Sequence, residues 1–78
     1  MIRKTEKLLI TFYTTTDAMA MEDMCKKHHV AGRIIPVPGN ISADCGLGWC
    51  AEPNEETALR EFIEKQNLRI QRIHRCMI

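Results

Sequence analysis

The residues of this chain best able to bond covalently with a substrate are its four cysteines, Cys25, Cys45, Cys50 and Cys76. Cys45 has the most reactive setting, because it follows a Pro- and Gly-containing loop and precedes Gly46 and Gly48. Glycines carry no side chain and would let another molecule approach the sulfur closely. We therefore expect covalent chemistry to run through Cys45. The alternative is that Cys45 is a small, partly buried apolar residue at the start of a strand.

The neighbours of Cys45 act on its charge in opposite directions. A cysteine reacts as the thiolate, and an ordinary thiol with a pKa of about 8.5 is only slightly ionised at pH 7. Asp44 works against the thiolate, because an adjacent carboxylate disfavours a second negative charge. Groups that could stabilise it, directly or if the fold brings them close, are the backbone N–H groups of Gly46 and Leu47, the Ser42 hydroxyl, Arg33 and His28.

The other three cysteines have simpler interpretations. Cys25 falls on the apolar side of a predicted helix and is expected in the core. Cys50 would face the opposite side of an extended strand from Cys45. Either Cys50, after a turn, or Cys76 could serve as a resolving thiol for Cys45, although an incidental role is the simpler one. We expect no metal site and no cofactor, because the cysteine spacing lacks the Cys-x2-4-Cys pairs typical of zinc sites.

The elements that must position Cys45 are predicted from hydrophobic patterning. Apolar, β-branched runs predict strands, and apolar residues at three- and four-residue steps predict helices. The expected order is strand 7–13, helix 18–28, strand 33–37, strand 45–51, helix 53–67 and strand 68–78. The last segment also fits helical spacing, and a strand is chosen because the first strand needs an edge partner. This order predicts an α+β fold, the ferredoxin-like βαββαβ sandwich: a four-stranded antiparallel sheet with two helices on one face.

Length and charge restrict the function further. The 78 residues fit one domain, residues 1–78, and the net charge of +1 is too balanced for a protein that mainly grips a polyanion. No apolar run approaches the ~18 residues of a membrane span, and no signal peptide is recognised. We therefore expect a cytoplasmic protein with reduced thiols. A basic stripe for RNA or an acidic partner remains open if the terminal strands are neighbours; its residues are Arg3, Lys4, Lys7, Arg69, Arg72, His74 and Arg75.

A resemblance to a known family rests on four segments: Leu9-Ile10-Thr11-Phe12, Thr15-x-x-Ala18-x-x-x-Glu22, Arg33-Ile34-Ile35-Pro36-Val37-Pro38 and Ile41-Ser42-Ala43-Asp44-Cys45-Gly46-Leu47. Together they resemble the selenium/sulfur carrier protein-like family of small bacterial domains. The most specific part is Pro-x-Pro followed by Ser-x-x-Cys-Gly. The resemblance covers about residues 8–51 and, more loosely, the second predicted helix.

The resemblance implies that Cys45 is the carrier residue, with Pro38, Ser42 and Gly46 in the loop around it. Better-known sulfur carriers place their cysteine directly before a proline at a helix start, whereas here Gly46 follows. The mechanism therefore does not transfer unchanged.

The predicted function is a non-enzymatic carrier that holds sulfane sulfur or selenium on Cys45 and passes it from donor to acceptor proteins. Ser42, Asp44, Gly46 and Gly48 would surround the carried atom. Two alternatives stay open: a regulatory or interaction module with a structural cysteine, and a thiol redox partner. Sequence leaves undecided the choice between sulfur and selenium and whether the protein forms a homodimer.

Overall fold

The computed structural model describes residues 5–39, 41 and 43–77, and its elements follow the predicted order. They are β1 (Glu6–Thr11), α1 (Thr15–Lys27), β2 (Arg33–Pro36), β3 (Leu47–Ala51), the short 3-10 helix η1 (Pro53–Glu55), α2 (Glu56–Lys65) and β4 (Arg72–Met77). The last element is a strand, as predicted. Neither helix of this described part has the length and apolar character needed to cross a lipid bilayer.

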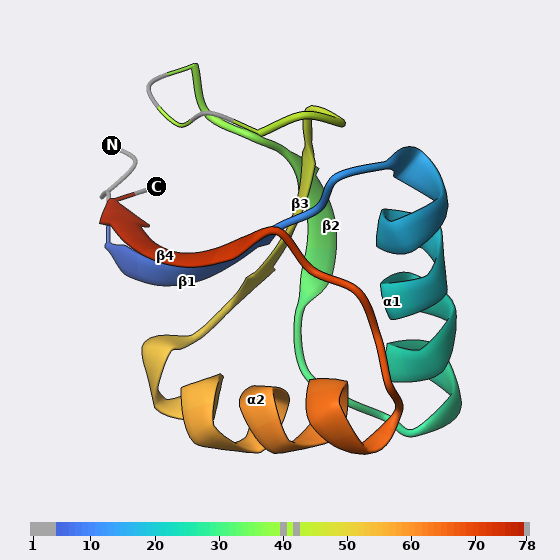
Figure 1. The fold of residues 1–78 in the computed structure, drawn as a ribbon. Helices are drawn as coiled ribbons and strands as arrows, with labels where there is room; N and C mark the ends of the chain where they lie inside the picture. The colour runs from blue at the N-terminus through green and yellow to red at the C-terminus, as the bar shows by residue number, and fades with distance from the viewer. Residues whose placement is uncertain (1–4, 40, 42, 78) are drawn as a thin grey trace.

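The four strands form one antiparallel sheet in the order β2-β3-β1-β4 (Figure 1). β1 is central and pairs with β3 on one side and β4 on the other. A helix lies in the connection from β1 to β2 and another in the connection from β3 to β4. The predicted α+β ferredoxin-like fold is confirmed.

The hydrophobic core lies between one face of the sheet and both helices. Leu8 and Ile10 of β1 are fully buried, and Trp49 and Ala51 of β3 lie on the same face. The helices complete the cluster with Ala18, Met21 and Cys25 from α1 and Leu59 and Ile63 from α2. Because all these side chains form a single cluster, both helices cover the same face of the sheet (Figure 1).

The other face of the sheet, here called the open face, carries the alternate residues of each strand. Its described residues include Lys7, Leu9 and Thr11 of β1, Cys50 of β3, and His74 and Cys76 of β4. Among the described residues, no helix packs on this face. Leu9 is nevertheless fully buried, and its side chain lies against Gly48 of the neighbouring strand.

Helix α1 begins at Thr15, earlier than the predicted start at Ala18. The Thr14 hydroxyl accepts a hydrogen bond from the backbone N–H of Asp17 at 3.1 Å. This cap satisfies one of the N–H groups left without a partner in the first helical turn. The first helical turn precedes the first apolar residue of the pattern, so apolar spacing predicts the start of the helix too late.

Strand β4 begins at Arg72, later than the predicted start at residue 68. The chain is still completing the end of α2 at Leu68, whose N–H donates to the Ile63 carbonyl at 2.9 Å. Asn67 has a φ of +55°, the left-handed conformation that commonly follows a helix. Apolar spacing does not reveal this closing turn of α2, so it predicts the start of the strand too early.

Candidate functional site

Cys45 lies in the loop between β2 and β3, close to the start of β3. The next residue, Gly46, has a φ of +75°, in the left-handed region that favours glycine. The Gly46 carbonyl accepts the N–H of Val37 at 2.9 Å and so closes the base of the loop. This turn interrupts extended backbone, so β3 begins at Leu47 and not, as predicted, at Cys45.

The Cys45 sulfur makes two contacts with the backbone of one residue. The Leu47 N–H donates to Sγ at 3.4 Å, and the thiol donates to the Leu47 carbonyl oxygen at the same distance. The N–H is one of the groups expected to favour a thiolate, because a donor hydrogen bond stabilises negative charge on sulfur. Together these two contacts with Leu47 fix the position of the sulfur.

Cys45 is half-buried and packs against the edge of the hydrophobic core. Gly46 beside it is exposed, and a Cβ built there would meet no heavy atom within 4 Å. One side of the cysteine is therefore supported by apolar contacts, and the adjoining residue borders open space. This arrangement fixes the thiol without sealing it from other molecules.

A side chain that the sequence analysis missed ties this loop to the sheet. Gln71 accepts the backbone N–H of Asp44 at its side-chain Oε1, at 3.3 Å. The Gln71 backbone N–H in turn donates to the Thr11 carbonyl at 2.8 Å. Gln71 lies far from the loop in sequence, and no spacing pattern predicts such a contact.

The remaining predicted site residues, Asp44, Gly48 and Ser42, differ in where they lie relative to Cys45. Asp44 is exposed and lies next to Cys45. Gly48 is buried, and a Cβ there would lie 2.7 Å from Leu9 Cδ1, so the Leu9 side chain fills the space beside this glycine. Ser42 lies outside the described residues.

The structure does not bring the two candidate cations to Cys45. Arg33 pairs with Cys50 at one end of the β2–β3 ladder. Cys45 lies near the other end, where Pro36 pairs with Leu47. His28 follows the C-terminal end of α1 and packs edge-on against Phe62, with ring centroids 5.4 Å apart. Among the candidates in the described residues, the Leu47 N–H is the one that contacts the sulfur.

Cys25 is confirmed as a core residue and is 1% exposed. Burial raises the pKa of its thiol to about 11, because the charged form loses its hydration. Cys25 therefore stays protonated and inaccessible at neutral pH.

Cys50 and Cys76 share the open face but are separated by β1. Two interstrand spacings of about 4.8 Å place their Cα atoms at least ~9 Å apart, beyond the ~7 Å limit for a disulfide. Burial raises the pKa of the Cys76 thiol, and the nearby Cys50 raises it further by a smaller amount. All four cysteines are free thiols.

The structure also places Trp49 and the side chains that could bind a metal ion. Trp49 is 3% exposed, and its Nε1 donates to the Ala31 carbonyl at 3.1 Å, so it belongs to the core. Within residues 5–39, 41 and 43–77, no three or more His, Cys, Asp or Glu side chains are grouped so as to hold a metal ion.

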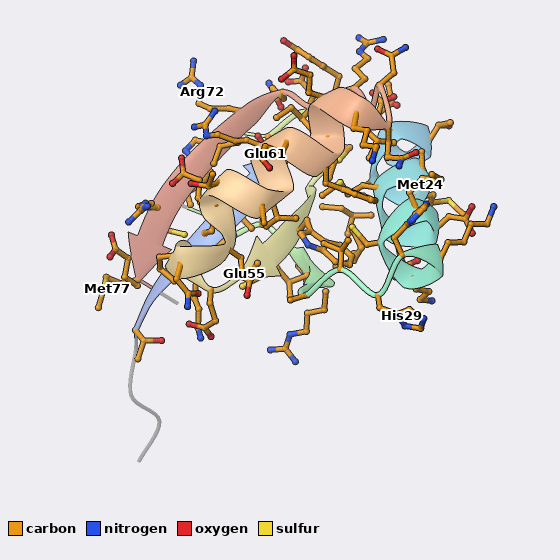
Figure 2. The ribbon with its side chains drawn as sticks, turned by 90° about the horizontal axis from the view of Figure 1, so that it is seen from below. Met24, His29, Glu55, Glu61, Arg72 and Met77 are labelled. Carbon is orange, nitrogen blue, oxygen red and sulfur yellow. The ribbon has the colours of Figure 1, made fainter. Side chains whose placement is uncertain are left out.

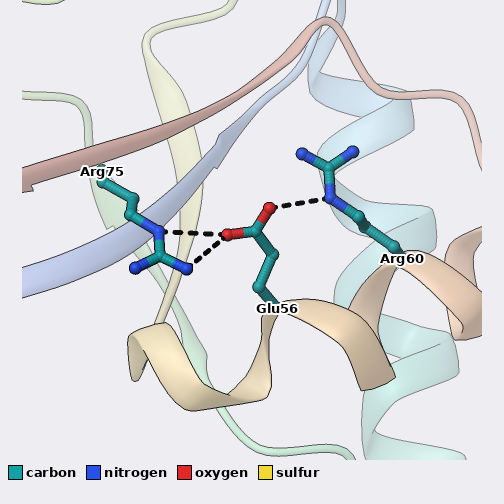
Figure 3. Close-up of polar contacts among 3 residues, drawn as sticks. All are labelled: Glu56, Arg60 and Arg75. Atoms are coloured by element: carbon teal, nitrogen blue, oxygen red, sulfur yellow. Dashed lines mark hydrogen bonds and ion pairs between the residues drawn. The ribbon is translucent and has the colours of Figure 1, made fainter.

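The predicted basic stripe is largely neutralised where the structure describes it. β1 and β4 are neighbours, but Arg75 is hydrogen-bonded to Glu56 of α2 (Figure 3). Arg69 lies 3.6 Å from Asp17 Oδ2 and stacks over the Tyr13 ring. Arg3 and Lys4 lie outside the described residues. The described residues of the stripe therefore do not form a continuous, unpaired basic surface.

A family model described as "Putative Se/S carrier protein-like" matches residues 7–75. The comparisons with curated proteins and with solved structures gave no significant match. The family match covers nearly the whole chain and includes the loop of Cys45, β3, both helices and most of β4. The chain belongs to the Se/S carrier protein-like family.

Proposed function

We propose that this protein carries sulfane sulfur or selenium on the single thiol of Cys45, as a persulfide or selenopersulfide. The observation that supports this most directly is the position of Sγ, fixed by the Leu47 N–H at 3.4 Å beside the exposed Gly46. The family match is consistent with a carrier role. A reducing compartment such as the cytoplasm would keep Cys45 in the thiol form that this role needs.

Loading would be a thiol exchange in which no net oxidation occurs. The Cys45 thiolate attacks the terminal sulfur of a donor persulfide and forms a new Sγ–S bond. The donor S–S bond breaks, and its electron pair leaves with the donor cysteine as a thiolate. For selenium, the same attack on the terminal selenium of a selenopersulfide yields the Cys45 selenopersulfide.

Unloading would reverse these roles. An acceptor thiolate attacks the outer sulfur or selenium, and Cys45 leaves as the thiolate. The Leu47 N–H would stabilise negative charge on Sγ both when it attacks and when it departs. The same hydrogen bond can thus assist transfer in both directions, which suits a carrier that must release its cargo.

The first test is a loading assay with a cysteine desulfurase and cysteine as the persulfide source. We expect intact-mass analysis to show the addition of one sulfur atom to the wild-type protein, and peptide mapping to place it on Cys45. Cys45→Ser should abolish the addition, whereas Cys50→Ser and Cys76→Ser should retain it. Loading that persists unchanged in Cys45→Ser would sink the proposal and favour a structural role for this cysteine.

A further inference from the structure

A second cysteine lies in a charged cavity at the opposite end of the β2–β3 ladder from Cys45. β1 and β2 begin there and β3 ends there, because β3 is antiparallel to both (Figure 1). The cavity has a volume of about 360 Å³. Its lining residues are Lys7, Ala31, Gly32, Arg33, Cys50, Ala51 and Glu52. This volume suits a small molecule rather than a protein segment.

One wall of the cavity is held by a close backbone crossing at Gly32. Gly32 has a φ of +125°, and a Cβ there would lie 2.2 Å from Trp49 Nε1 and 2.8 Å from the Cys50 carbonyl oxygen. The Trp49 ring anchors this crossing by donating to the Ala31 carbonyl at 3.1 Å. The buried side chain of Trp49 therefore fixes the position of the wall beside Cys50.

The charges around the cavity favour an anion. Lys7 Nζ forms an ion pair with Glu52 Oε1, so the carboxylate is already matched. Arg33 is exposed, pairs with Cys50 across the β2–β3 ladder and has no ion-pair partner among the described residues. Lys7, Arg33 and Glu52 together carry one net positive charge, and the half-buried Cys50 lines the same cavity.

From this combination we infer that Cys50 is a thiol-exchange site for small, carboxylate-bearing disulfides of the glutathione class. The Cys50 thiolate attacks one sulfur of the disulfide and forms a mixed disulfide with it. The original S–S bond breaks, and the second half leaves as a thiolate, so electrons and atoms balance without an added oxidant. The Arg33 guanidinium attracts the ligand carboxylates.

This site is independent of the carrier role proposed for Cys45. The two cysteines lie at opposite ends of the ladder, on different sides of the sheet, and share no described contact. Cys76 lies opposite Lys7 on β4 and does not line the cavity, so it provides a comparison thiol on the same open face.

The test uses the Cys45→Ser/Cys76→Ser variant, in which Cys50 is the accessible thiol and Cys25 stays buried. Its rate of mixed-disulfide formation is measured by intact mass with glutathione disulfide, which is anionic, and with cystamine, which is cationic. The ratio of the two rates is divided by the ratio for the same variant unfolded in urea. We expect this normalised ratio to exceed one. On Arg33→Gln it should fall by more than fivefold at low ionic strength, because one unit charge at ~4 Å in water changes the rate about fivefold for each ligand and acts in opposite directions on the anion and the cation.

Arg72→Gln is the matched control, because Arg72 is another exposed arginine but lies on β4, away from the cavity (Figure 2). It should leave the normalised ratio unchanged, and salt near 1 M should suppress the preference for the anion. A normalised ratio of one or less, an unreactive Cys50, or a preference that survives Arg33→Gln would overturn the inference. Loading of Cys45 with persulfide is measured separately and can succeed or fail without affecting this result.

Discussion

At the scale of single residues, backbone setting separates four identical side chains into different roles. Cys25 is enclosed by the core, Cys45 is held by the Leu47 backbone, and Cys50 and Cys76 lie on the open face. A thiol's chemistry depends on its ionisation and its access to other molecules, and both are set by such surroundings. The structure therefore supports separate proposals for Cys45 and Cys50.

Gly32 offers a prediction about the wall of the Cys50 cavity. Gly32→Ala should destabilise the protein by roughly 2–4 kcal/mol, because the new Cβ collides with Trp49 and the backbone is in the left-handed region. The shift should appear as a lower urea midpoint for unfolding. Gly39→Ala is the control, since a Cβ there meets no heavy atom within 4 Å, and its effect should stay within ~0.5 kcal/mol. Equal effects of the two substitutions would contradict the close crossing.

Part of the candidate site was predictable from the sequence at this scale. The loop glycines and the Ser-x-x-Cys-Gly pattern singled out Cys45, and the expected Leu47 N–H does contact its sulfur. The Gln71 anchor and the cavity at Cys50 were not predictable, because both depend on strand register. Only the register shows that Arg33 lies opposite Cys50 and away from Cys45.

At the scale of the elements, Glu56 connects helix α2 to strand β4. Its carboxylate accepts hydrogen bonds from Arg75 of β4 at 2.8 and 3.1 Å and from Arg60, one turn along the helix, at 2.8 Å (Figure 3). The hydrogen bonds from Arg75, and after them the bond from Arg60, lower the pKa of Glu56 from its ordinary value of 4.5. This contact supplements the apolar packing of α2, which carries most of its attachment to the sheet.

The lowered pKa of Glu56 predicts an acid-dependent loss of stability. A carboxyl whose pKa is lower in the folded state stabilises the fold fully above the unfolded pKa of 4.5 and loses this effect as the pH falls through the folded pKa. Glu56→Gln should therefore be less stable than wild type at pH 7. The difference should shrink below pH 4.5, as measured by thermal unfolding across a pH series.

Glu61 is the control for this prediction, because it is exposed on the same helix (Figure 2) and has no ion pair among the described contacts. Glu61→Gln should leave the pH dependence of stability close to that of wild type. A stability difference between Glu56→Gln and wild type that is constant from neutral to acidic pH would argue against a role for the ionised carboxylate.

The elements themselves were largely predictable, and their ends were not. The apolar run at Leu8–Ile10 predicted a buried strand, and the spacing of Ala18, Met21 and Cys25 predicted the helix face that enters the core. Ends depend on single backbone conformations, such as the left-handed Gly46 before β3 and Asn67 after α2. Periodicity does not detect such residues, which explains the errors at β3 and β4.

At the scale of the whole molecule, the fold covers one face of the sheet with helices and leaves Cys45 and Cys50 at opposite ends of the β2–β3 ladder. The βαββαβ order was enough to predict this architecture, because short crossovers with helices on one side allow few arrangements of four strands. The sequence alone did not reveal that two chemically distinct thiol environments result. In the proposed account, the Cys45 end exchanges cargo with proteins, and the Cys50 end reacts with small anionic disulfides.

The most direct test of the central claim follows the cargo on and off Cys45. The Cys50→Ser/Cys76→Ser variant is loaded with radioactive sulfur by a desulfurase, freed of donor and mixed with an excess of a thiol acceptor. We predict that one labelled sulfur atom per chain maps to Cys45 and that the acceptor removes it, restoring the free thiol. Label that never attaches to Cys45, or that attaches and is not released to any thiol, would contradict the carrier account.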